Sequence, residues 1–420
     1  MKKAIIIPVY LRLTEPDDLL DLQEVRLTGR AIESLRILDD QDFSLVLPVC
    51  TDMDGEEKEG DLAEVDRLLK DEVGRLRKEN TLIFSSHHLK DLQEFLRQRD
   101  LRNFYPLIDL KGYSKIRNTG LLLAQATAAD VAVFIDNDEV VEDPAFLNIA
   151  CEFLNDRVNG KRLQGKGGFY VNGDGNILLP PQRLWWKFLW NKTRWMNRVW
   201  ESILSSQDRL VSSPILLGGN LTLHRTLFRH VPFDPYIPRG EDTDYLINAS
   251  QLGYGLLFDR ELRIRHLHPE RTEAYFQEEL RGDIERFLYE RRKVNPVRNS
   301  SGRLNPAGII LECNPAAEQR GIISNGVNVG PRMALDPYPG RFLNWTLYPR
   351  AILSSFFLGL DYLGKGQWRK AGECMKNLQL FFHTEDGGWV KYLRFRADWE
   401  RAMEIIQREG MDELLEGCWI

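Results

Sequence analysis

The residues best suited to chemistry are acids that follow a short apolar run. Residues 131–135 read VAVFI, which predicts a buried strand because β-branched and aromatic side chains favour strands. Asp136, Asn137, Asp138 and Glu139 follow directly. Buried carboxylates are unfavourable unless they are paired or bind a metal, so we expect their oxygens at a cleft beyond the carboxyl end of this strand. Such oxygens suit Mg²⁺ or Mn²⁺, and an acidic surface turn is the alternative that the motif leaves open.

Basic and amide side chains precede this strand. Lys115, Arg117 and Asn118 lie at the start of a helix predicted from Arg117 onward. Helix N-termini favour anions, and guanidinium and ammonium groups bind phosphates, so these residues could hold a diphosphate. A solvated helix start explains the same residues without a ligand.

A second acidic group begins another predicted helix, after Gly240. Glu241, Asp242 and Asp244 occupy its first turn, where acids also simply favour the helix dipole. Apolar residues later in this helix look like core positions, so the acidic end should lie at the edge of a cleft.

Histidines and glycines mark two further strands. The strand predicted over 256–267 ends near His266 and His268, which share a face because residues two apart in a strand point the same way. At least one of them is a candidate metal ligand beside the acids. The apolar run 215–223 contains Gly218, Gly219 and Asn220, and glycines inside a strand often mark the close approach of a ligand.

The elements that position these groups alternate between strands and helices. Apolar runs predict strands at 4–9, 43–49 and 81–84, and helical periodicity covers 27–38, 62–76 and 90–101. A helix over 144–154 and a strand with turns over 161–179 follow the acidic motif. Alternation of this kind predicts an α/β fold with a parallel, doubly wound sheet.

The order of the motifs resembles that of nucleotide-sugar-dependent glycosyltransferases of the GT-A fold, especially the large family 2 group. The resemblance covers roughly residues 4–269. It rests on seven short motifs in the expected order: Pro8-Val9-Tyr10, Asp52, Arg117-Asn118-Thr119-Gly120, Asp136-Asn137-Asp138, Gly218-Gly219-Asn220, Glu241-Asp242 and His266 with His268.

The resemblance implies a Rossmann-like mixed sheet flanked by helices, and a transferase that moves a sugar, hexosyltransferase-like, from a nucleoside diphosphate to a hydroxyl acceptor with Mg²⁺ or Mn²⁺. It also implies roles for individual residues. Asp242 would be the base of an inverting reaction, with Glu241 second. Asp138 would bind the metal with His266 or His268. Residues that bind the nucleotide sugar would be Pro8, Tyr10, Asp52, Arg117, Asn118, Asp136, Gly219 and Asn220.

Two other function classes remain beside this one. A non-catalytic nucleotide-sugar-binding protein could use the same scaffold. A nucleotidyltransferase is disfavoured, because residues 10–18 contain no glycine where that group has its phosphate loop. Retention of configuration, and an acceptor that is a small solute, a lipid-linked sugar or a polysaccharide, stay open.

The bulk composition fits a globular protein. The 420 residues are 43% hydrophobic and 28% charged, with a net charge of −6, so no global basic field indicates a nucleic-acid partner. Five dispersed cysteines predict reduced thiols. No apolar stretch has membrane-spanning length, so we expect a cytoplasmic protein, with peripheral contact at the inner membrane face left open.

The rest of the chain predicts three regions: a catalytic domain over 1–293, a linker or surface insertion over 294–331, and a helical extension over 332–420. The extension could complete the acceptor site or form a homodimer contact. Residues 183–200 hold five tryptophans among basic residues. They could stack on sugars, meet a membrane interface, dock a partner or simply pack inside the protein.

Overall fold

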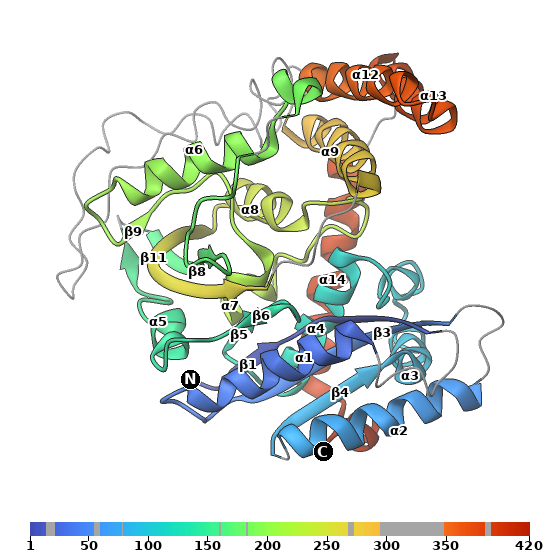
Figure 1. Cartoon of the computed structure of the whole chain (residues 1–420). Helices are drawn as coiled ribbons and strands as arrows, with labels where there is room; N and C mark the ends of the chain where they lie inside the picture. The colour runs from blue at the N-terminus through green and yellow to red at the C-terminus, as the bar shows by residue number, and fades with distance from the viewer. Residues whose placement is uncertain are drawn as a thin grey trace, which may run out of the picture.

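A computed structural model of the chain describes residues 1–13, 22–53, 59–77, 79–158, 161–181, 184–267, 273–294, 348–382 and 388–420. Helices surround a central sheet that is parallel in its first half and mixed in its second (Figure 1). The α/β class and the mixed sheet flanked by helices are therefore confirmed.

Eleven strands pair in order of contact as β4-β3-β1-β5-β10-β8-β11-β6, with β2 beside β3, β7 beside β8 and β9 beside β11. Strands β1 to β5 pair in parallel, and β10 runs antiparallel between β5 and β8. The strands are β1 Lys3–Ile6, β2 Val9–Leu13, β3 Ser44–Met53, β4 Thr81–Ser85, β5 Val131–Phe134, β6 Glu139–Val140, β7 Arg157–Val158, β8 Lys161–Val171, β9 Leu210–Val211, β10 Leu221–His224 and β11 Gly255–His266.

Helices cover both faces of the sheet because its strands point alternate side chains to opposite sides. Ala4 and Ile6 belong to one core cluster, while Ile5 and Ile7 belong to the other. The first face is covered by α3 Ser86–Arg97, α4 Tyr113–Ala126, α6 Lys192–Leu204, α8 Glu241–Gln251 and α14 Gly388–Glu409. The second is covered by α1 Gln23–Ser34, α2 Glu59–Leu76 and α5 Phe146–Cys151.

Several element boundaries differ from the sequence-based expectation. The strand expected over 4–9 is broken into β1 and β2 at Ile7 and Pro8, since proline has no backbone N–H for a ladder. Helix α4 begins at Tyr113, so Arg117 lies in its second turn rather than at its start. The strand expected over 161–179 ends at Val171. In the run 215–223, the glycines belong to the short helix η5 Gly218–Asn220. Only the last residues of the run, from Leu221 onward, belong to β10.

The C-terminal helices pack in two places. Helix α12 Tyr348–Gly364 lies against α13 Trp368–Lys376, α9 Glu273–Val294 and the short helix η4 Trp185–Phe188, at one end of the molecule (Figure 1). Helix α14 instead joins the core of α4, where Phe395 stacks on Phe104 with ring centroids 5.1 Å apart. After α15 Asp412–Leu415, the chain returns to the sheet and Ile420 N–H bonds Thr81 O.

The C-terminal helices expected beyond residue 331 thus exist, but α14 shares the core of the preceding region. Nearly all of the expected linker, from residue 295 onward, lies outside the described residues. No helix in the described ranges is both long enough and apolar enough to cross a membrane.

Candidate functional site

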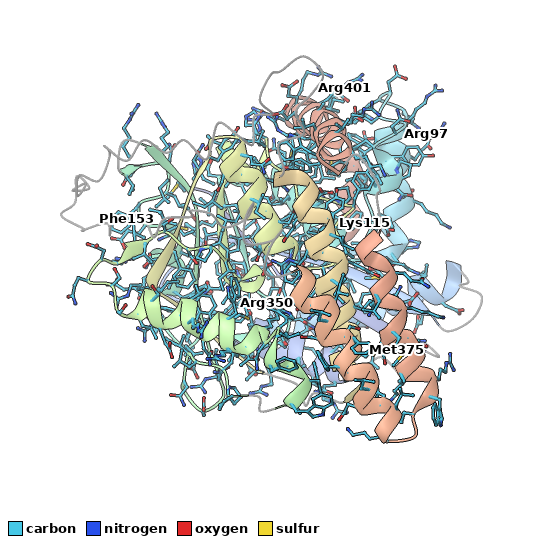
Figure 2. The ribbon with its side chains drawn as sticks, turned by 90° about the horizontal axis from the view of Figure 1, so that it is seen from above. Arg97, Lys115, Phe153, Arg350, Met375 and Arg401 are labelled. Carbon is cyan, nitrogen blue, oxygen red and sulfur yellow. The ribbon has the colours of Figure 1, made fainter. Side chains whose placement is uncertain are left out.

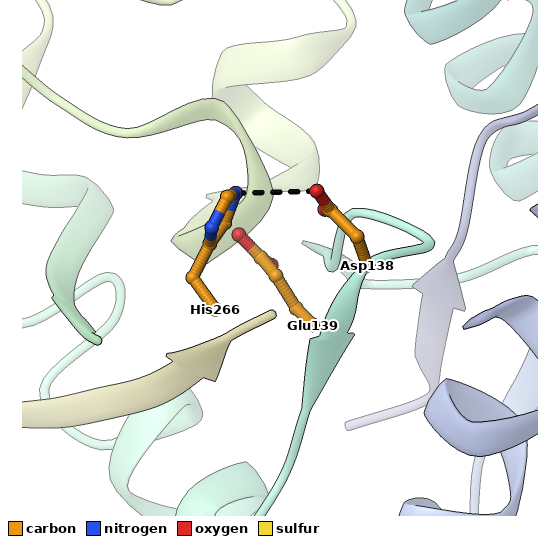
Figure 3. Close-up of side chains that lie close together, drawn as sticks. All are labelled: Asp138, Glu139 and His266. Carbon is orange, nitrogen blue, oxygen red and sulfur yellow. Dashed lines mark ion pairs between the residues drawn. The ribbon is translucent and has the colours of Figure 1, made fainter. Parts of the chain in front are cut away.

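The acidic turn and the expected histidine meet through pairing of β6 with β11. The turn joins the end of β5 to β6, and Glu139 on β6 is the pairing partner of His266 on β11. The N–H of Leu267 donates to Asp138 O at 2.7 Å, which fixes this register. His266 Nε2 consequently lies 3.4 Å from Asp138 Oδ2 (Figure 3). Ligand atoms of Asp138, Glu139 and His266 all lie within 4.8 Å of one another.

Glu139 is the most buried acid of this group, with 0% of its surface exposed. Its Oε2 accepts a hydrogen bond from the Asp136 N–H at 2.9 Å, while Oε1 has no hydrogen-bond partner among the described residues. Burial, then the charges of Asp136 and Asp138, raise the pKa of Glu139 well above its usual value. Burial and the charge of Asp136 also raise the pKa of Asp138, to about 7. The site therefore holds more negative charge than its surroundings stabilise.

Tyr170 on β8 supports this cluster from one side. Its ring stacks on His266, with centroids 4.9 Å apart and an interplanar angle of 20°. The hydroxyl accepts a hydrogen bond from the Gly219 N–H at 2.8 Å and donates to Asp136 Oδ2 at 3.4 Å. Tyr170 thus contacts both the candidate metal ligand His266 and the acidic turn.

Gly219 lies so close to the acids that any side chain would collide with them. A Cβ there would overlap the carboxylate oxygens of Glu139 and lie 2.6 Å from Asp136 Cγ. The sequence predicted that a ligand approaches this backbone. In the structure, the groups that come close are the side chains of Glu139 and Asp136 themselves.

Arg117 is the cation that joins the acidic turn to α8. Its guanidinium donates to Asp136 Oδ1 at 2.7 Å, to Glu241 Oε1 at 3.2 Å and to Gly218 O at 2.9 Å. Burial would lower the pKa of Arg117, but the charges of Asp136 and Glu241 outweigh it and raise that pKa. Arg117 is therefore committed to the acids of the site.

The three acids that begin α8 have different surroundings. Glu241 is buried against Arg117, and burial raises its pKa despite that cation. Asp244 is fully buried and accepts a hydrogen bond from Asn248 Nδ2 at 2.8 Å. Asp242 is half-buried, and its Oδ1 accepts the Thr243 N–H at 2.6 Å. Of the three, Asp242 has the carboxylate that is most accessible to another molecule.

Tyr10 at the start of β2 and Asp52 near the end of β3 lie on adjacent parallel strands and contact each other. The Tyr10 hydroxyl donates to Asp52 Oδ2 at 3.2 Å, and Lys111 Nζ lies 2.7 Å from Asp52 Oδ1. The hydrogen bond from Lys111 is the main reason that the pKa of Asp52 lies below its usual value. Pro8 is half-buried between β1 and β2.

Two of the residues expected near the nucleotide have buried side chains that bond to backbone. Asn118 donates to Phe233 O and accepts the Phe233 N–H, both at 2.8 Å. Asn220 Nδ2 donates to Phe169 O at 3.1 Å, which joins η5 to β8. Both side chains are 0% exposed, so their contacts hold the scaffold together. His268 lies outside the described residues.

Sequence reasoning missed Glu139 as a ligand, Tyr170 and Lys111. Glu139 was visible as the acid after Asp138, but only the β6–β11 register shows that it faces His266. Lys111 lies close in sequence to the basic residues already noted before the central strand. Tyr170 gave no signal, because an aromatic residue in a strand usually belongs to the core.

The donor set fits a divalent cation. Two carboxylates and one imidazole converge, and Glu139 Oε1 is buried without a hydrogen-bond donor among the described residues, so a bound cation would compensate it. Oxygen and imidazole ligands suit Mn²⁺, and the oxygens alone suit Mg²⁺. The residues that would hold the ion are Asp138, Glu139 and His266.

Comparisons with known proteins give similar structures only. No family model matches the chain, and no curated protein matches its sequence. The mannosyltransferase PcManGT from Pyrobaculum calidifontis, solved with GDP-Man and Mn²⁺, is 14% identical, with 97% of this chain and 87% of that chain covered and a TM-score of 0.42. TarS from S. aureus is 13% identical over 96% of this chain and 55% of that chain, with a TM-score of 0.40.

A third similar structure is glucosyl-3-phosphoglycerate synthase from Mycobacterium tuberculosis, solved with Mn²⁺, UDP and phosphoglyceric acid. It is 14% identical, with 67% of this chain and 78% of that chain covered and a TM-score of 0.34. At such identities and scores, the likeness does not identify the activity of this chain.

Proposed function

We propose that this protein is a metal-dependent glycosyltransferase that moves a sugar from a nucleoside diphosphate to a hydroxyl acceptor. The observation that carries the proposal is the convergence of Asp138, Glu139 and His266, with a buried and unpaired carboxylate oxygen, beyond the carboxyl ends of parallel strands. Open α/β sheets bind ligands at that edge. The motif resemblance to GT-A enzymes supplies the reaction class.

In this proposal, Asp138, Glu139 and His266 would hold the divalent cation that accompanies the diphosphate of the donor. A bound Mg²⁺ or Mn²⁺ would stabilise the negative charge that develops on the leaving nucleoside diphosphate. Arg117 fixes Asp136 in place through its hydrogen bond of 2.7 Å, so that Asp136 can face the ribose or the sugar. Tyr10, Asp52 and Pro8 would line the pocket of the base and the ribose.

Asp242 is the proposed base. In an inverting transfer, the acceptor oxygen bonds to the anomeric carbon as the bond from that carbon to the phosphate oxygen breaks. Asp242 takes the proton of the acceptor hydroxyl, and the nucleoside diphosphate leaves. Glu241 suits this role less well, because it is buried and held by Arg117 at 3.2 Å.

The first experiment is a donor and metal screen on the full chain. UDP-, GDP-, ADP- and dTDP-sugars are each tested with and without Mn²⁺, by thermal melting and by release of the nucleoside diphosphate. A true donor binds the folded state and raises the melting temperature, and we expect this only with metal. Asp138→Asn should abolish both the shift and the release.

The control variant is Asp100→Asn, an exposed aspartate in the left-handed backbone region that asparagine tolerates. It should behave as wild type. Metal-dependent binding without turnover across a broad acceptor panel would favour a non-catalytic nucleotide-sugar-binding protein. A screen in which no sugar nucleotide binds would refute both functions.

A further inference from the structure

The tryptophan-rich stretch and α12 together form an exposed apolar patch. Helix η4 contributes Trp185, 54% exposed, and Phe188, 63% exposed, and Leu184 directly before the helix is also exposed. Helix α12 contributes Leu353, Phe357 and Leu360, which share one face because they are spaced by four and three residues. The ring centroid of Phe357 lies 4.9 Å from that of Phe188 and 6.1 Å from that of Trp185. The two helices therefore present one continuous surface.

The other tryptophans of this stretch serve the core. Trp186, Trp190 and Trp200 are buried, and Trp190 Nε1 donates to Asp283 on α9 at 3.1 Å. The Trp185 indole is fixed at the surface instead, by a hydrogen bond of 2.8 Å to Asp361 Oδ1 on α12. Core packing thus explains most of the aromatic residues and leaves Trp185 and Phe188 unexplained.

Basic side chains lie near both ends of the α12 part of this patch. Arg350 is exposed and lies three residues before Leu353, at the start of the apolar face of α12, while Lys365 follows its end (Figure 2 labels Arg350). Residues 184–204 and 348–376 together contain nine lysines and arginines but only three acids. The whole chain has the opposite balance, with 56 basic and 62 acidic residues. These two segments, which also include α6 and α13, therefore carry a net positive charge, and Asp361 on the patch pairs with Lys365 at 3.1 Å.

We propose that this patch attaches the protein to the surface of a bilayer that contains anionic lipids. Tryptophan and phenylalanine insert at the boundary between headgroups and acyl chains, and neighbouring lysines and arginines attract anionic headgroups. No described helix spans a membrane, so the attachment is peripheral. This inference goes beyond glycosyl transfer and does not depend on it.

Charge argues against two other occupants. A symmetric dimer through this patch would bring the two basic rims together, and like charges across an interface are unfavourable. The chain segment 295–347 contains five arginines and three acids, so it has the same sign of charge as the rim. Anionic headgroups are complementary to the rim, whereas these occupants are not.

The test is co-sedimentation of the full chain with vesicles, in the absence of metal and donor. One set of vesicles contains phosphatidylcholine alone, and the other contains phosphatidylcholine with phosphatidylglycerol. We expect binding to the anionic vesicles that decreases with salt. Arg350→Glu should lower the partition coefficient roughly 25-fold, because each unit of charge near such a surface contributes about fivefold and the substitution changes the charge by two units. Phe188→Ser should lower binding to the anionic vesicles as well.

Two control variants match these changes on surfaces away from the patch. Arg102→Glu reverses a charge that is 79% exposed, and Ile37→Ser removes an apolar side chain that is 42% exposed. Both should bind vesicles as wild type does. The proposal is overturned if wild type does not sediment with anionic vesicles, or if the controls weaken binding as much as the patch variants. It is also overturned if Phe188→Ser turns a dimer into a monomer without changing vesicle binding.

Because the measurement omits donor and metal, its failure would leave the proposed transferase activity untouched. Failure of the donor screen would equally leave the membrane contact standing.

Discussion

Two groups of charged side chains lie beside the same pair of strands, β8 and β11, and differ in their balance of charge. In the first group, Lys166 Nζ on β8 lies 2.9 Å from Asp259 Oδ2 on β11, and both side chains are 0% exposed. Arg209 donates to Asp259 Oδ1 at 2.9 Å and also contacts Glu152 and Glu261. Each of the fully buried charges in this closed cluster therefore has a partner of opposite sign.

The second group, the open cluster, contains Asp136, Asp138, Glu139 and Glu241, and Arg117 is the one lysine or arginine that pairs with these acids among the described residues. It lies further along the same strands, where Tyr170 follows Lys166 on β8 and His266 follows Asp259 on β11. The Arg117 guanidinium pairs with Asp136 and Glu241 only, so Asp138 and Glu139 have no ion pair with a lysine or arginine among the described residues.

The pKa values separate the two groups. Burial alone would raise the pKa of Asp259, but Lys166 and Arg209 outweigh it, and that pKa lies below its usual value. Burial raises the pKa of Asp138 to about 7, and no described cation compensates. A structural ion cluster is neutralised by its own residues, whereas a binding site keeps a deficit that its ligand fills. The comparison teaches that uncompensated negative charge, rather than burial of charge as such, distinguishes the candidate site from a structural ion cluster.

The largest expected effect is a loss of stability when one partner of the closed cluster is removed. Lys166→Met leaves Asp259 buried with only Arg209, and breaking a buried ion pair on one side typically costs about 3–5 kcal/mol. We expect a loss of that size in the free energy of unfolding, measured by urea denaturation. Lys365→Met is the control, because it removes a lysine that is 46% exposed and lies 3.1 Å from Asp361. It should cost about 1 kcal/mol or less.

The dependence of stability on acidic pH tests whether Asp259 is ionised in the closed cluster. A group whose folded pKa is lowered, such as Asp259, contributes stability above its unfolded pKa and loses it as pH falls through the folded value. The difference in unfolding free energy between wild type and Asp259→Asn should therefore be constant above about pH 5 and narrow below about pH 4. A difference that stayed constant into strong acid would show that Asp259 is not ionised in the closed cluster.

The next largest effect is expected from a substitution in the open cluster. Glu139→Gln removes one of the surplus carboxylates and keeps an oxygen for the Asp136 N–H. Without metal, the unfolding free energy should stay the same or rise by about 1 kcal/mol, because glutamine avoids the cost of burying a charge or of taking up a proton on folding, which the raised pKa of Glu139 implies. The increase in melting temperature that Mn²⁺ causes in wild type should be lost.

Glu142→Gln provides the matched control for that substitution. Glu142 is 55% exposed and pairs with Arg265, outside the acidic group. It should retain the full stabilisation by Mn²⁺. If Glu139→Gln destabilised the protein as strongly as Lys166→Met, the open cluster would be a structural ion network like the closed one.

The residues of the candidate site that belong to short sequence motifs could be proposed from the sequence. Asp136 and Asp138 after an apolar run, and His266 at the end of a later strand, could be recognised from residue type and position alone. The role of Glu139 could not, because it depends on which residue of β6 lies opposite His266. A shift of one residue in that pairing would turn Glu139 away from the histidine.

The fold was predictable to a similar extent. Alternating runs gave the strands and helices of the parallel half, but the order of β10, β8 and β11 depends on pairings between residues far apart in the chain. The same limit explains Asn118 and Asn220, since a motif does not show that their amides bond the backbone of Phe233 and Phe169. Whether such an amide is buried and bonded to backbone is decided only when distant parts of the chain pack together.

The smallest expected effect sharpens the comparison within the open cluster. Tyr170→Phe keeps the ring that stacks on His266 but removes the hydroxyl that accepts the Gly219 N–H and donates to Asp136. Losing one such buried hydroxyl should lower the unfolding free energy by about 1 kcal/mol. If the hydroxyl also orients the acidic turn for a metal, Mn²⁺ affinity should fall about tenfold or more, as for other groups that position metal ligands.

Tyr392→Phe separates these two effects, because the buried Tyr392 hydroxyl donates to Pro232 O at 3.2 Å, away from the acidic turn. It should cost a similar amount of stability and leave Mn²⁺ affinity, measured by titration calorimetry, unchanged. Equal Mn²⁺ affinities for both variants and wild type would mean that the acids around Gly219 hold their positions without Tyr170. A loss of Mn²⁺ affinity in Tyr170→Phe alone would mean that the Tyr170 hydroxyl positions the acids of the open cluster for a metal ion. The open cluster would then differ from the closed one, in which lysine and arginine supply the positive charge.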